Sequence, residues 1–388
     1  MRVYADNAAT TRTDPEILEK MIPVFTETYG NPSSIHTAGR EAFFVLKEAR
    51  DRTAKALGAL PDEIYFTSGG TEADNWAILG TAKKYAAKGK HIISSAIEHH
   101  AVLHTLEKGD FDVTYLPVNE EGFVSCEDLE NAIREDTVLV TVMMANNEIG
   151  AIQPIKKLAE IAHQHNVLFH TDAVQAVGHI PLDVKELGVD MLSLSGHKFN
   201  APKGIGALYV RKGLVLPNLM QGGAQEKGKR PGTENVPGAY GMSLALEKAV
   251  ANLPETTGRL CAMRDKLIDG ILSSIPHCRR NSPTHDCLPG LVNVSVKYLE
   301  GESILLMLDM NGICASSGSA CTSGSLDPSH VLLALGLDHE TAHGSVRFSL
   351  NHSNTEEEVD YILEKFPQII TRLREMSPLW EKVENKQG

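Results

Sequence analysis

The sequence contains little cysteine and no paired cysteine motif. Six cysteines are spread over 388 residues, and no two of them form a CxxC pair. This spacing is too sparse for the disulfide framework that stabilises small secreted proteins. The scarcity predicts reduced thiols and a cytoplasmic protein.

Long hydrophobic runs are also missing. The longest apolar stretch, VLVTVMMA at 138–145, is far shorter than the roughly 20 residues that span a bilayer. The opening MRVYADNAATT includes Asp6 and lacks the apolar core of a signal peptide. We therefore expect no membrane contact.

Positive charge is in short supply. The chain has 37 Lys and Arg against 50 Asp and Glu, which gives a formal net charge of −13. Nucleic-acid-binding proteins need a basic face for the phosphates, so we expect no nucleic acid. The small basic cluster EKGKRPG at 226–232 is too short to change this expectation, although it could hold a phosphate or an acidic partner.

The pattern of short apolar runs and helical segments predicts an α/β fold. The length favours two domains. The first has apolar strands separated by helices, which is typical of a mainly parallel sheet covered by helices on both faces. Strands are expected at 63–68, 91–95, 113–118, 138–145, 167–171 and 191–195. In such sheets ligands bind at the carboxyl ends of the strands.

A second, smaller α+β domain is predicted after residue 254. Helical patterns at 236–252 and 256–275 are separated by Pro254, which we expect to break the helix and mark the boundary. The first dozen residues contain no long helix and could return to pack on the smaller domain. The expected division is 13–254 for the large domain, and 1–12 with 255–388 for the small one.

Polar residues follow several of the predicted strands. Gly69, Gly70 and Thr71 lie between a strand and a helix, where backbone N–H groups can bind an anion, although an ordinary tight turn explains them equally well. His100 and His104 have the i, i+4 spacing of metal ligands, but no third ligand lies nearby in sequence. A partly exposed helix start is the alternative interpretation.

A carboxylate and an amine end two successive apolar strands. Asp172 ends one strand, and Ser195, His197 and Lys198 follow another. Burying either charge is costly unless it is paired, neutralised or covalently bound. Pyridoxal phosphate requires both an acidic partner for its ring nitrogen and a lysine for its aldehyde. We therefore assign Asp172 to the ring nitrogen and Lys198 to the aldehyde, and we assign the phosphate to the Gly70–Thr71 turn with Ser195 and His197.

The segment SSGSACTSGS at 316–325 places Cys321 among small residues. Such a run is typical of a flexible linker with an incidental cysteine. The alternative is a reactive thiol. The other five cysteines are expected to be structural, with Cys314 close enough in sequence to deserve a check.

Together these motifs resemble the pyridoxal-phosphate-dependent cysteine desulfurases of the NifS/IscS group, within the class-V aminotransferases. The resemblance runs from about residue 3 to 376. It is carried by the motifs DNAATT, YGNPSSIH, TSGGTEADN, EHHAV, ANNEIG, TDAVQAVG, SGHK, RPGTENV, SSGSACTSGS and VRFSL. It implies the fold-type I architecture of these transferases.

The resemblance also implies a role for each matching residue. Lys198 would be the Schiff-base lysine and Cys321 the sulfur-accepting nucleophile, and His99 would stack on the ring and be able to move protons. The remaining implied cofactor contacts are Asp172 to the ring nitrogen, Gln175 to the ring hydroxyl, Asn147 beside the ring and substrate, and Gly70, Thr71, Ser195 and His197 at the phosphate. Thr233 would reach the phosphate of a neighbouring subunit, which implies a homodimer, and Arg347 would bind the substrate carboxylate.

The implied reaction converts L-cysteine to L-alanine and leaves a persulfide on Cys321. An iron–sulfur scaffold protein of the NifU/IscU kind, or another acceptor, would receive the sulfur. No resident metal is expected, although Cys321 could briefly contact a cluster on that partner. A selenocysteine lyase, a cystine lyase or an aminotransferase would keep the cofactor and change the chemistry. A persulfide carrier without enzymatic activity, or a hydrolase using Cys321 with a histidine, are more distant alternatives.

Small departures from the family pattern leave the required groups in place. The phosphate turn has GGT where many relatives have AT after a small residue, and EHHAV has His100 where Lys or Pro is common. The Ser-rich segment around Cys321 is of the longer kind found in desulfurases that serve iron–sulfur scaffolds.

Overall fold

A seven-stranded sheet forms the centre of the larger unit in the computed structural model, which describes residues 1–317, 328–377 and 380. The strand order is β2-β8-β7-β6-β5-β3-β4, and β8 alone runs antiparallel to its neighbours. The strands are β2 (Ile64–Thr67), β3 (His91–Ser95), β4 (Asp112–Leu116), β5 (Thr137–Thr141), β6 (Leu168–Asp172), β7 (Met191–Ser195) and β8 (Gly206–Val210). The predicted α/β class with a mainly parallel sheet is confirmed, and β8 is a strand that the sequence analysis did not identify.

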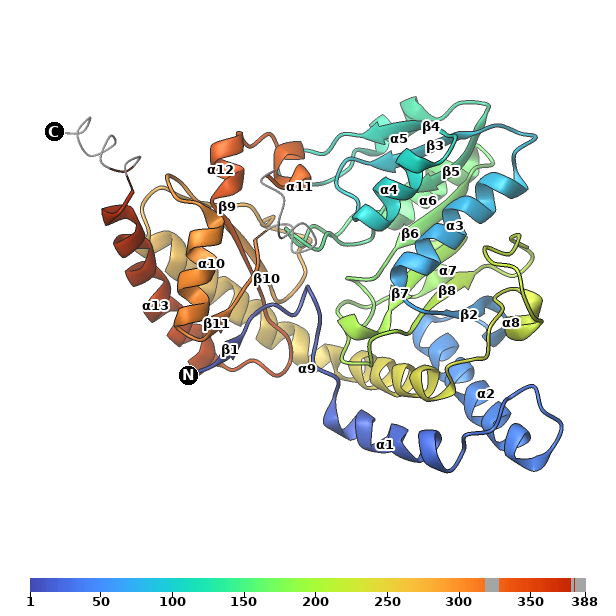
Figure 1. The fold of residues 1–388 in the computed structure, drawn as a ribbon. Helices are drawn as coiled ribbons and strands as arrows, with labels where there is room; N and C mark the ends of the chain where they lie inside the picture. Colours follow the sequence, from blue (N-terminus) through green and yellow to red (C-terminus); the bar gives the residue numbers. More distant parts are fainter. Residues whose placement is uncertain (318–327, 378–379, 381–388) are drawn as a thin grey trace.

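Helices cover both faces of this sheet (Figure 1). Alternate residues of the strands enter two separate cores, as the two-residue period of a strand requires. For example, Ile93 and Phe169 pack in one core, and Ile92 and Leu208 pack in the other with Trp76. The helices of this unit are α1 (Pro15–Thr26), α2 (Thr37–Leu57), η1 (Pro61–Glu63), α3 (Gly70–Lys84), α4 (His100–Lys108), α5 (Cys126–Ala132), α6 (Ile155–Gln164), α7 (Val184–Leu187), η2 (Gly196–Lys198) and α8 (Gln225–Gly228).

The smaller unit is built on an antiparallel sheet of order β12-β10-β9 and a two-stranded parallel pair, β1 with β11. Its separate core brings Val3 and Ala5 together with residues from Leu260 to Ile370. The elements are β1 (Val3–Tyr4), β9 (Cys278–Arg280), β10 (Leu291–Val296), α10 (Gly301–Met310), β11 (Ile313–Cys314), α11 (His330–Ala334), α12 (His339–His343), β12 (Ser345–Ser349) and α13 (Glu356–Glu375). The domain division at residues 12 and 254 stays a prediction, and one further core crosses it by joining Ile97 and Met143 with Val331 and Leu332.

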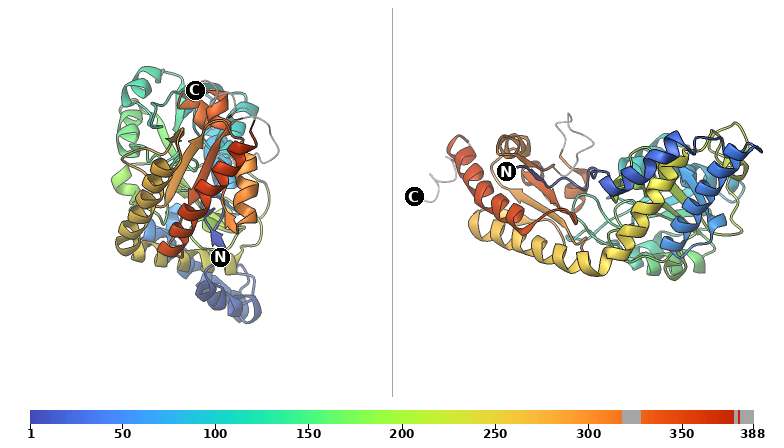
Figure 2. Two further views of the ribbon diagram at one scale, coloured as in Figure 1. Left: turned by 90° about the vertical axis from the view of Figure 1, so that its left-hand side faces the viewer. Right: turned by 90° about the horizontal axis from the view of Figure 1, so that it is seen from below.

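One long helix, α9 (Val236–Ser274), runs through both units. Its first half contributes Met242 to the core of the larger unit, and its second half contributes Leu267 to the core of the smaller one. The predicted break at Pro254 is wrong, because the helix continues through the proline. A proline removes one backbone hydrogen bond and bends a helix, and packing of both halves compensates for that loss. Figure 2 shows the bend near the middle of the helix.

Candidate active site

A cavity of about 640 Å³ lies at the carboxyl ends of the parallel strands, where the two units face each other. Its lining includes ten of the predicted site residues, which are Gly70, Thr71, His99, Asn147, Asp172, Gln175, Ser195, His197, Lys198 and Arg347. Ala8, Ala9 and Thr10 from the N-terminal segment and His330 from α11 complete the wall. The chain therefore gathers these side chains from positions more than 300 residues apart.

Lys198 ends the 3-10 turn η2, directly after strand β7. Its Nζ donates to the backbone oxygens of Ala8 at 2.6 Å and Ala9 at 2.9 Å. Gln175 Nε2 donates to the same Ala8 oxygen at 3.0 Å. The amine is thus held in the cavity by uncharged carbonyls.

Asp172 lies at the end of β6 and is buried. Burial raises its pKa to about 6, while the Val174 N–H, at 2.9 Å, and the charge of Lys198 favour the ionised form. Asp74 is also buried, and burial together with the Asp172 charge raises the pKa of Asp74 well above its usual value. A cation beside Asp172 would stabilise the ionised carboxylate. A protonated pyridine nitrogen is a cation of this kind.

The turn before α3 is suited to a phosphate. Gly69 occupies the N-cap position of α3 and makes no side-chain hydrogen bond to the helix. The first N–H groups of α3 therefore remain available to bind an anion. Thr71 is in the first turn of α3, and Ser195, His197 and Lys203 line the same cavity. The donor set fits a phosphate, and Asp172 with Lys198 fits the ring and aldehyde of pyridoxal phosphate.

His99 caps helix α4 through its ring. Nδ1 accepts a hydrogen bond from the Ala101 N–H at 3.1 Å. Burial, with a further contribution from the charge of Lys198, lowers the His99 pKa to about 4. At neutral pH the ring is therefore neutral and carries its proton on Nε2.

Arg347 reaches the cavity from β12 of the smaller unit. Its side chain is buried, Nη2 pairs with Asp6 Oδ1 at 3.1 Å, and Nη1 donates to the Asn147 backbone oxygen at 2.8 Å. Nε is buried and has no partner among the described residues. An unmatched guanidinium N–H of this kind is suited to a carboxylate ligand.

Two buried glutamates in the wall were missed by the sequence analysis. Burial raises the pKa of Glu98 to about 8 and that of Glu148 to about 7. Glu98 Oε1 accepts from Ser95 Oγ at 2.5 Å, whereas Oε2 has no partner among the described residues. Glu98 lies in the motif EHHAV and Glu148 lies in the motif ANNEIG. Their place in these family motifs is the sequence signal that could have identified them as site residues.

Thr233 does not line this cavity. It lines a neighbouring pocket, which shares Ser68 and Gly204 with the cofactor cavity. Its role at a partner's phosphate stays a prediction. Cys321 lies outside the described residues, so its assigned role also stays a prediction.

The remaining histidines and cysteines form no metal centre in the described part of the chain. The rings of His100 and His104 lie 4.8 Å apart between centroids, and those of His100 and His330 lie 5.0 Å apart. Across residues 1–317 and 328–377, no group of three or more histidine, cysteine or acidic side chains is arranged to hold a metal. Cys314 lies on β11 opposite Tyr4 and does not line the cavity.

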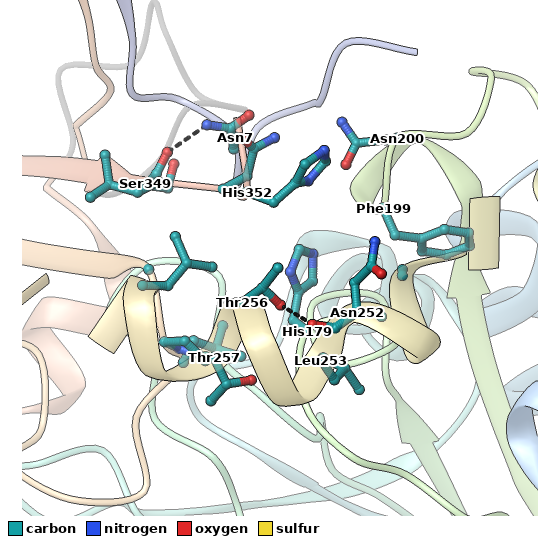
Figure 3. A pocket seen from close by; sticks show the side chains of 18 of the residues that line it. Asn7, His179, Phe199, Asn200, Asn252, Leu253, Thr256, Thr257, Ser349 and His352 are labelled. Atoms are coloured by element: carbon teal, nitrogen blue, oxygen red, sulfur yellow. Dashed lines mark hydrogen bonds between the residues drawn. The ribbon is translucent and has the colours of Figure 1, made fainter. Parts of the chain in front are cut away.

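A second cavity, of about 80 Å³, shares Ala8 and Gln175 with the lining of the first. Figure 3 shows the side chains around it. His179 faces it and also contacts the Lys198 backbone oxygen through Nε2 at 2.9 Å. This space is far too small for the cofactor. The larger cavity is therefore the candidate active site.

The pattern of class-V aminotransferases matches residues 3–362. The chain belongs to the class-V aminotransferase family. Enzymes of this family that resemble this chain depend on pyridoxal phosphate, which confirms the predicted cofactor.

Named relatives in this family are similar over almost the whole chain. A cysteine desulfurase IscS of Clostridium botulinum (strain Hall) is 56% identical over 385 residues, 98% of this chain and 97% of the relative. The cysteine desulfurase IscS of Methanosarcina thermophila is 55% identical over 98% of this chain and 95% of its own length. A solved NifS-like protein superposes with a TM-score of 0.91 at 42% identity, covering 96% of this chain and 100% of that structure.

Proposed function

We propose that the protein is a cysteine desulfurase that transfers sulfur from L-cysteine to Cys321. The observation that supports this proposal best is the cavity, which brings Lys198, Asp172 and the α3 turn together with Arg347. A relative that is 56% identical to this chain is named a cysteine desulfurase. In the net reaction the carbon–sulfur bond of L-cysteine breaks and a sulfur–sulfur bond forms on Cys321. One of the two thiol protons ends on the β-carbon of L-alanine in place of the sulfur, and the other stays on the persulfide. The reduction of that carbon balances the oxidation of sulfur, so no external oxidant is needed.

The side chains divide this task. Arg347 binds the substrate carboxylate, and Asn147 lies beside it. Lys198 holds the cofactor, which when bound supplies the electron sink for chemistry at the substrate α-carbon. His99 would hold a proton at Nε2 on the cavity wall. Asp172 would pair with the cofactor's ring nitrogen, and Gln175 would bind its ring hydroxyl. Gly70, Thr71, Ser195 and His197 would bind the phosphate.

The decisive experiment replaces the nucleophile. Cys321→Ser should still bind pyridoxal phosphate and L-cysteine, since the residues of the cavity are unchanged. It should release no L-alanine, because a hydroxyl is a far weaker nucleophile than a thiol at neutral pH. Normal alanine release would contradict the assignment, and a matched Cys314→Ser variant should keep wild-type activity.

We also propose a homodimer with active sites near the subunit interface. Large apolar side chains are exposed on α1, α2 and the segment between them, including Phe25, Tyr29, Ile35, Phe43 and Phe44. A gathering of this kind is typical of an interaction surface. A second copy covering it would explain the role implied for Thr233. Phe44→Glu should produce monomers by light scattering, whereas Leu306→Glu, on the exposed face of α10, should not.

The sulfur acceptor proposed here is an iron–sulfur scaffold protein, in keeping with the IscS name of the relatives. The described cysteines are all free, as expected in a reducing compartment, and we place the protein in the cytoplasm. None of the described helices is long and apolar enough to cross a membrane. Persulfide transfer to a purified scaffold, followed by mass spectrometry, tests the acceptor.

A further inference from the structure

The turn that is suited to the cofactor phosphate contains a carboxylate of its own. Glu72 lies in the first turn of α3, directly after Thr71, and lines the same cavity as Ser68 and Gly70. Its Oε2 accepts a hydrogen bond from the Ser68 N–H at 2.7 Å. The side chain therefore ties the start of the turn between β2 and α3 to the helix and helps to fix the shape of the turn.

The carboxyl group of Glu72 is ionised. Burial alone would raise its pKa, but hydrogen bonds from Arg230 and Ser68 outweigh burial and hold the pKa below its usual value. A phosphate monoester carries about two negative charges at neutral pH and uses the same positive end of a helix as this carboxylate. Without a neutralising partner, Glu72 would therefore repel the phosphate from the turn that it shapes.

Arg230 is this neutralising partner. Its Nε donates to Glu72 Oε1 at 2.8 Å, and its Nη2 donates to Glu72 Oε2 at 3.1 Å. Paired hydrogen bonds of this kind are charge-assisted and stronger than neutral ones. The side chains of Arg230 and Glu72 are only 23% and 11% exposed, so water screens their charges incompletely. Arg230 does not line the cofactor cavity itself, and it reaches that cavity through Glu72.

The segment that carries Arg230 is fastened by a second ion pair. The Glu226 carboxylate is buried and accepts from Arg50 Nη1 at 2.8 Å, from Arg50 Nη2 at 2.5 Å and from the Phe66 N–H at 3.0 Å. Glu226 and Lys227 have φ angles of 45° and 59°, in the left-handed region that costs free energy for residues other than glycine. The buried ion pair offsets this cost and keeps the segment next to β2 and the turn that follows it.

The other cations of the basic cluster at 226–232 are paired elsewhere. Lys227 Nζ lies 2.6 Å from Asp62 Oδ1 at the surface, and Lys229 Nζ donates to the Leu216 backbone oxygen at 3.4 Å. The cluster therefore binds groups of its own chain, and Arg230 is the member that contacts the phosphate turn.

We propose that Arg230 is a positioning residue for the cofactor phosphate. It neutralises Glu72, so that this carboxylate can hold the turn in shape without repelling the phosphate. Neither residue takes part in the chemistry at the substrate. The inference rests on the phosphate position proposed above, and it gives a role to an ion pair that the predicted site does not include.

The test uses the full-length protein freed of its cofactor and two ligands. Pyridoxal phosphate has the phosphate, and pyridoxal has the same ring and aldehyde without it. The dissociation constant of each ligand is measured by titration, from the visible absorption of the bound form, which requires no turnover. The variants are Arg230→Gln, Arg230→Lys, Glu72→Gln and the double variant with both glutamines. Lys227→Gln is the matched control, because Lys227 lies in the same segment and pairs with Asp62 at the surface.

Arg230→Gln should weaken the binding of pyridoxal phosphate roughly 10- to 30-fold, because an unpaired carboxylate then faces a dianion in a partly buried site. The binding of pyridoxal should not change. Arg230→Lys keeps the charge and should lose much less, and Glu72→Gln should bind pyridoxal phosphate at least as tightly as the wild-type protein. The double variant should return to within about threefold of wild type, since neither charge is left without its partner.

Three results would overturn the proposal. One is a double variant that binds pyridoxal phosphate as weakly as Arg230→Gln, because an ion pair that only fastens the segment would give that result. Another is an equal loss for both ligands in Arg230→Gln. The third is wild-type affinity for pyridoxal phosphate in that variant.

A further variant tests the phosphate position on which the inference rests. Ser195→Ala should weaken the binding of pyridoxal phosphate and leave that of pyridoxal unchanged. Wild-type binding of both ligands would show that the phosphate lies elsewhere, and the role of Arg230 would be wrong with it. The reaction has no part in these measurements, so a protein that binds both ligands as expected but forms no alanine would contradict the proposed function alone.

Discussion

The two sides of the active-site cavity leave buried groups of opposite charge incompletely paired. On the large-unit side, Asp74, Asp172 and Glu98 are buried carboxyls whose pKa values burial raises, and two of their oxygens lack hydrogen-bond partners among the described residues. On the small-unit side, Arg347 pairs with Asp6 and with the Asn147 backbone oxygen, but its buried Nε has no partner among the described residues, and Ser329 pairs with Glu148. The first side has buried carboxyls that a cationic cofactor ring can complete, whereas the second presents the guanidinium that we propose binds the substrate carboxylate.

The largest expected effect comes from the amine on the cofactor side. Lys198→Ala should abolish the visible absorption of the covalently bound cofactor and reduce alanine formation to background, because no other group replaces the covalent attachment. Circular dichroism should show an intact fold. Lys185→Ala removes an exposed lysine on α7, outside the cavity, and serves as the control. Equal losses in both variants would show that Lys198 has no special role.

On the small-unit side, the arginine should affect substrate binding most. Arg347→Lys keeps the charge but loses the planar fork that binds a carboxylate through two hydrogen bonds. We expect KM for L-cysteine to rise roughly 10- to 100-fold with a smaller change in kcat. Steady-state kinetics and the affinity for pyridoxal phosphate are measured together. A variant that loses cofactor affinity while keeping KM would place Arg347 on the cofactor side.

Cofactor affinity should depend on the proton held by Asp172. Its pKa is raised to about 6 in the free chain, and a cationic ring nitrogen requires the ionised form. Below pH 6 the proton must leave before the cofactor binds, so affinity should fall by roughly tenfold per pH unit. Titration of the apoenzyme with pyridoxal phosphate between pH 5 and 8 measures this. Asp172→Asn should bind more weakly and lose this part of the pH dependence, and parallel profiles for the two proteins would contradict the assignment.

The smallest effect concerns stability and comes from Glu98. Its pKa is raised to about 8 in the folded protein, whereas in the unfolded chain it is close to the usual 4.5. Between these values the folded state keeps a proton that the unfolded state has lost. The free energy of unfolding should therefore fall by about 1.4 kcal/mol per pH unit as the pH rises through this range.

Urea unfolding at a series of pH values tests this slope. Glu98→Gln should remove it, while Glu302→Gln, at an exposed position on α10, should leave it unchanged. The same slope in both variants would show that Glu98 is ionised in the folded protein.

The cofactor side was largely predictable from the sequence, because strand ends of a parallel sheet meet at one edge. Asp172, Ser195 and Lys198 follow recognisable apolar strands, and the structure brings them into one cavity. The family and the cofactor are likewise confirmed. The proton states of Glu98 and Glu148 could not be predicted, since they depend on burial by distant segments.

Other features depend on tertiary packing, which local sequence does not show. Pro254 is a helix breaker by propensity, yet packing on both of its sides keeps α9 continuous. The contact of Ala8 with Lys198 joins residues 190 positions apart, and no local pattern indicates it. Thr233 lies in an adjacent pocket of the same chain, and the role predicted for it would need a second copy of the chain.

The position of β1 has a consequence for the order in which the protein can mature during synthesis. Val3 pairs with Ile313, and Asp6 forms a bridge with Ser349, so the first strand acquires its partners only after most of the chain has left the ribosome. Ala8 and Ala9, whose backbone oxygens accept from the Lys198 amine, lie four and five residues after this strand. Arg347 is also translated late. A nascent chain can therefore form the large sheet early, as domains generally do, while its catalytic centre stays incomplete until translation is almost finished.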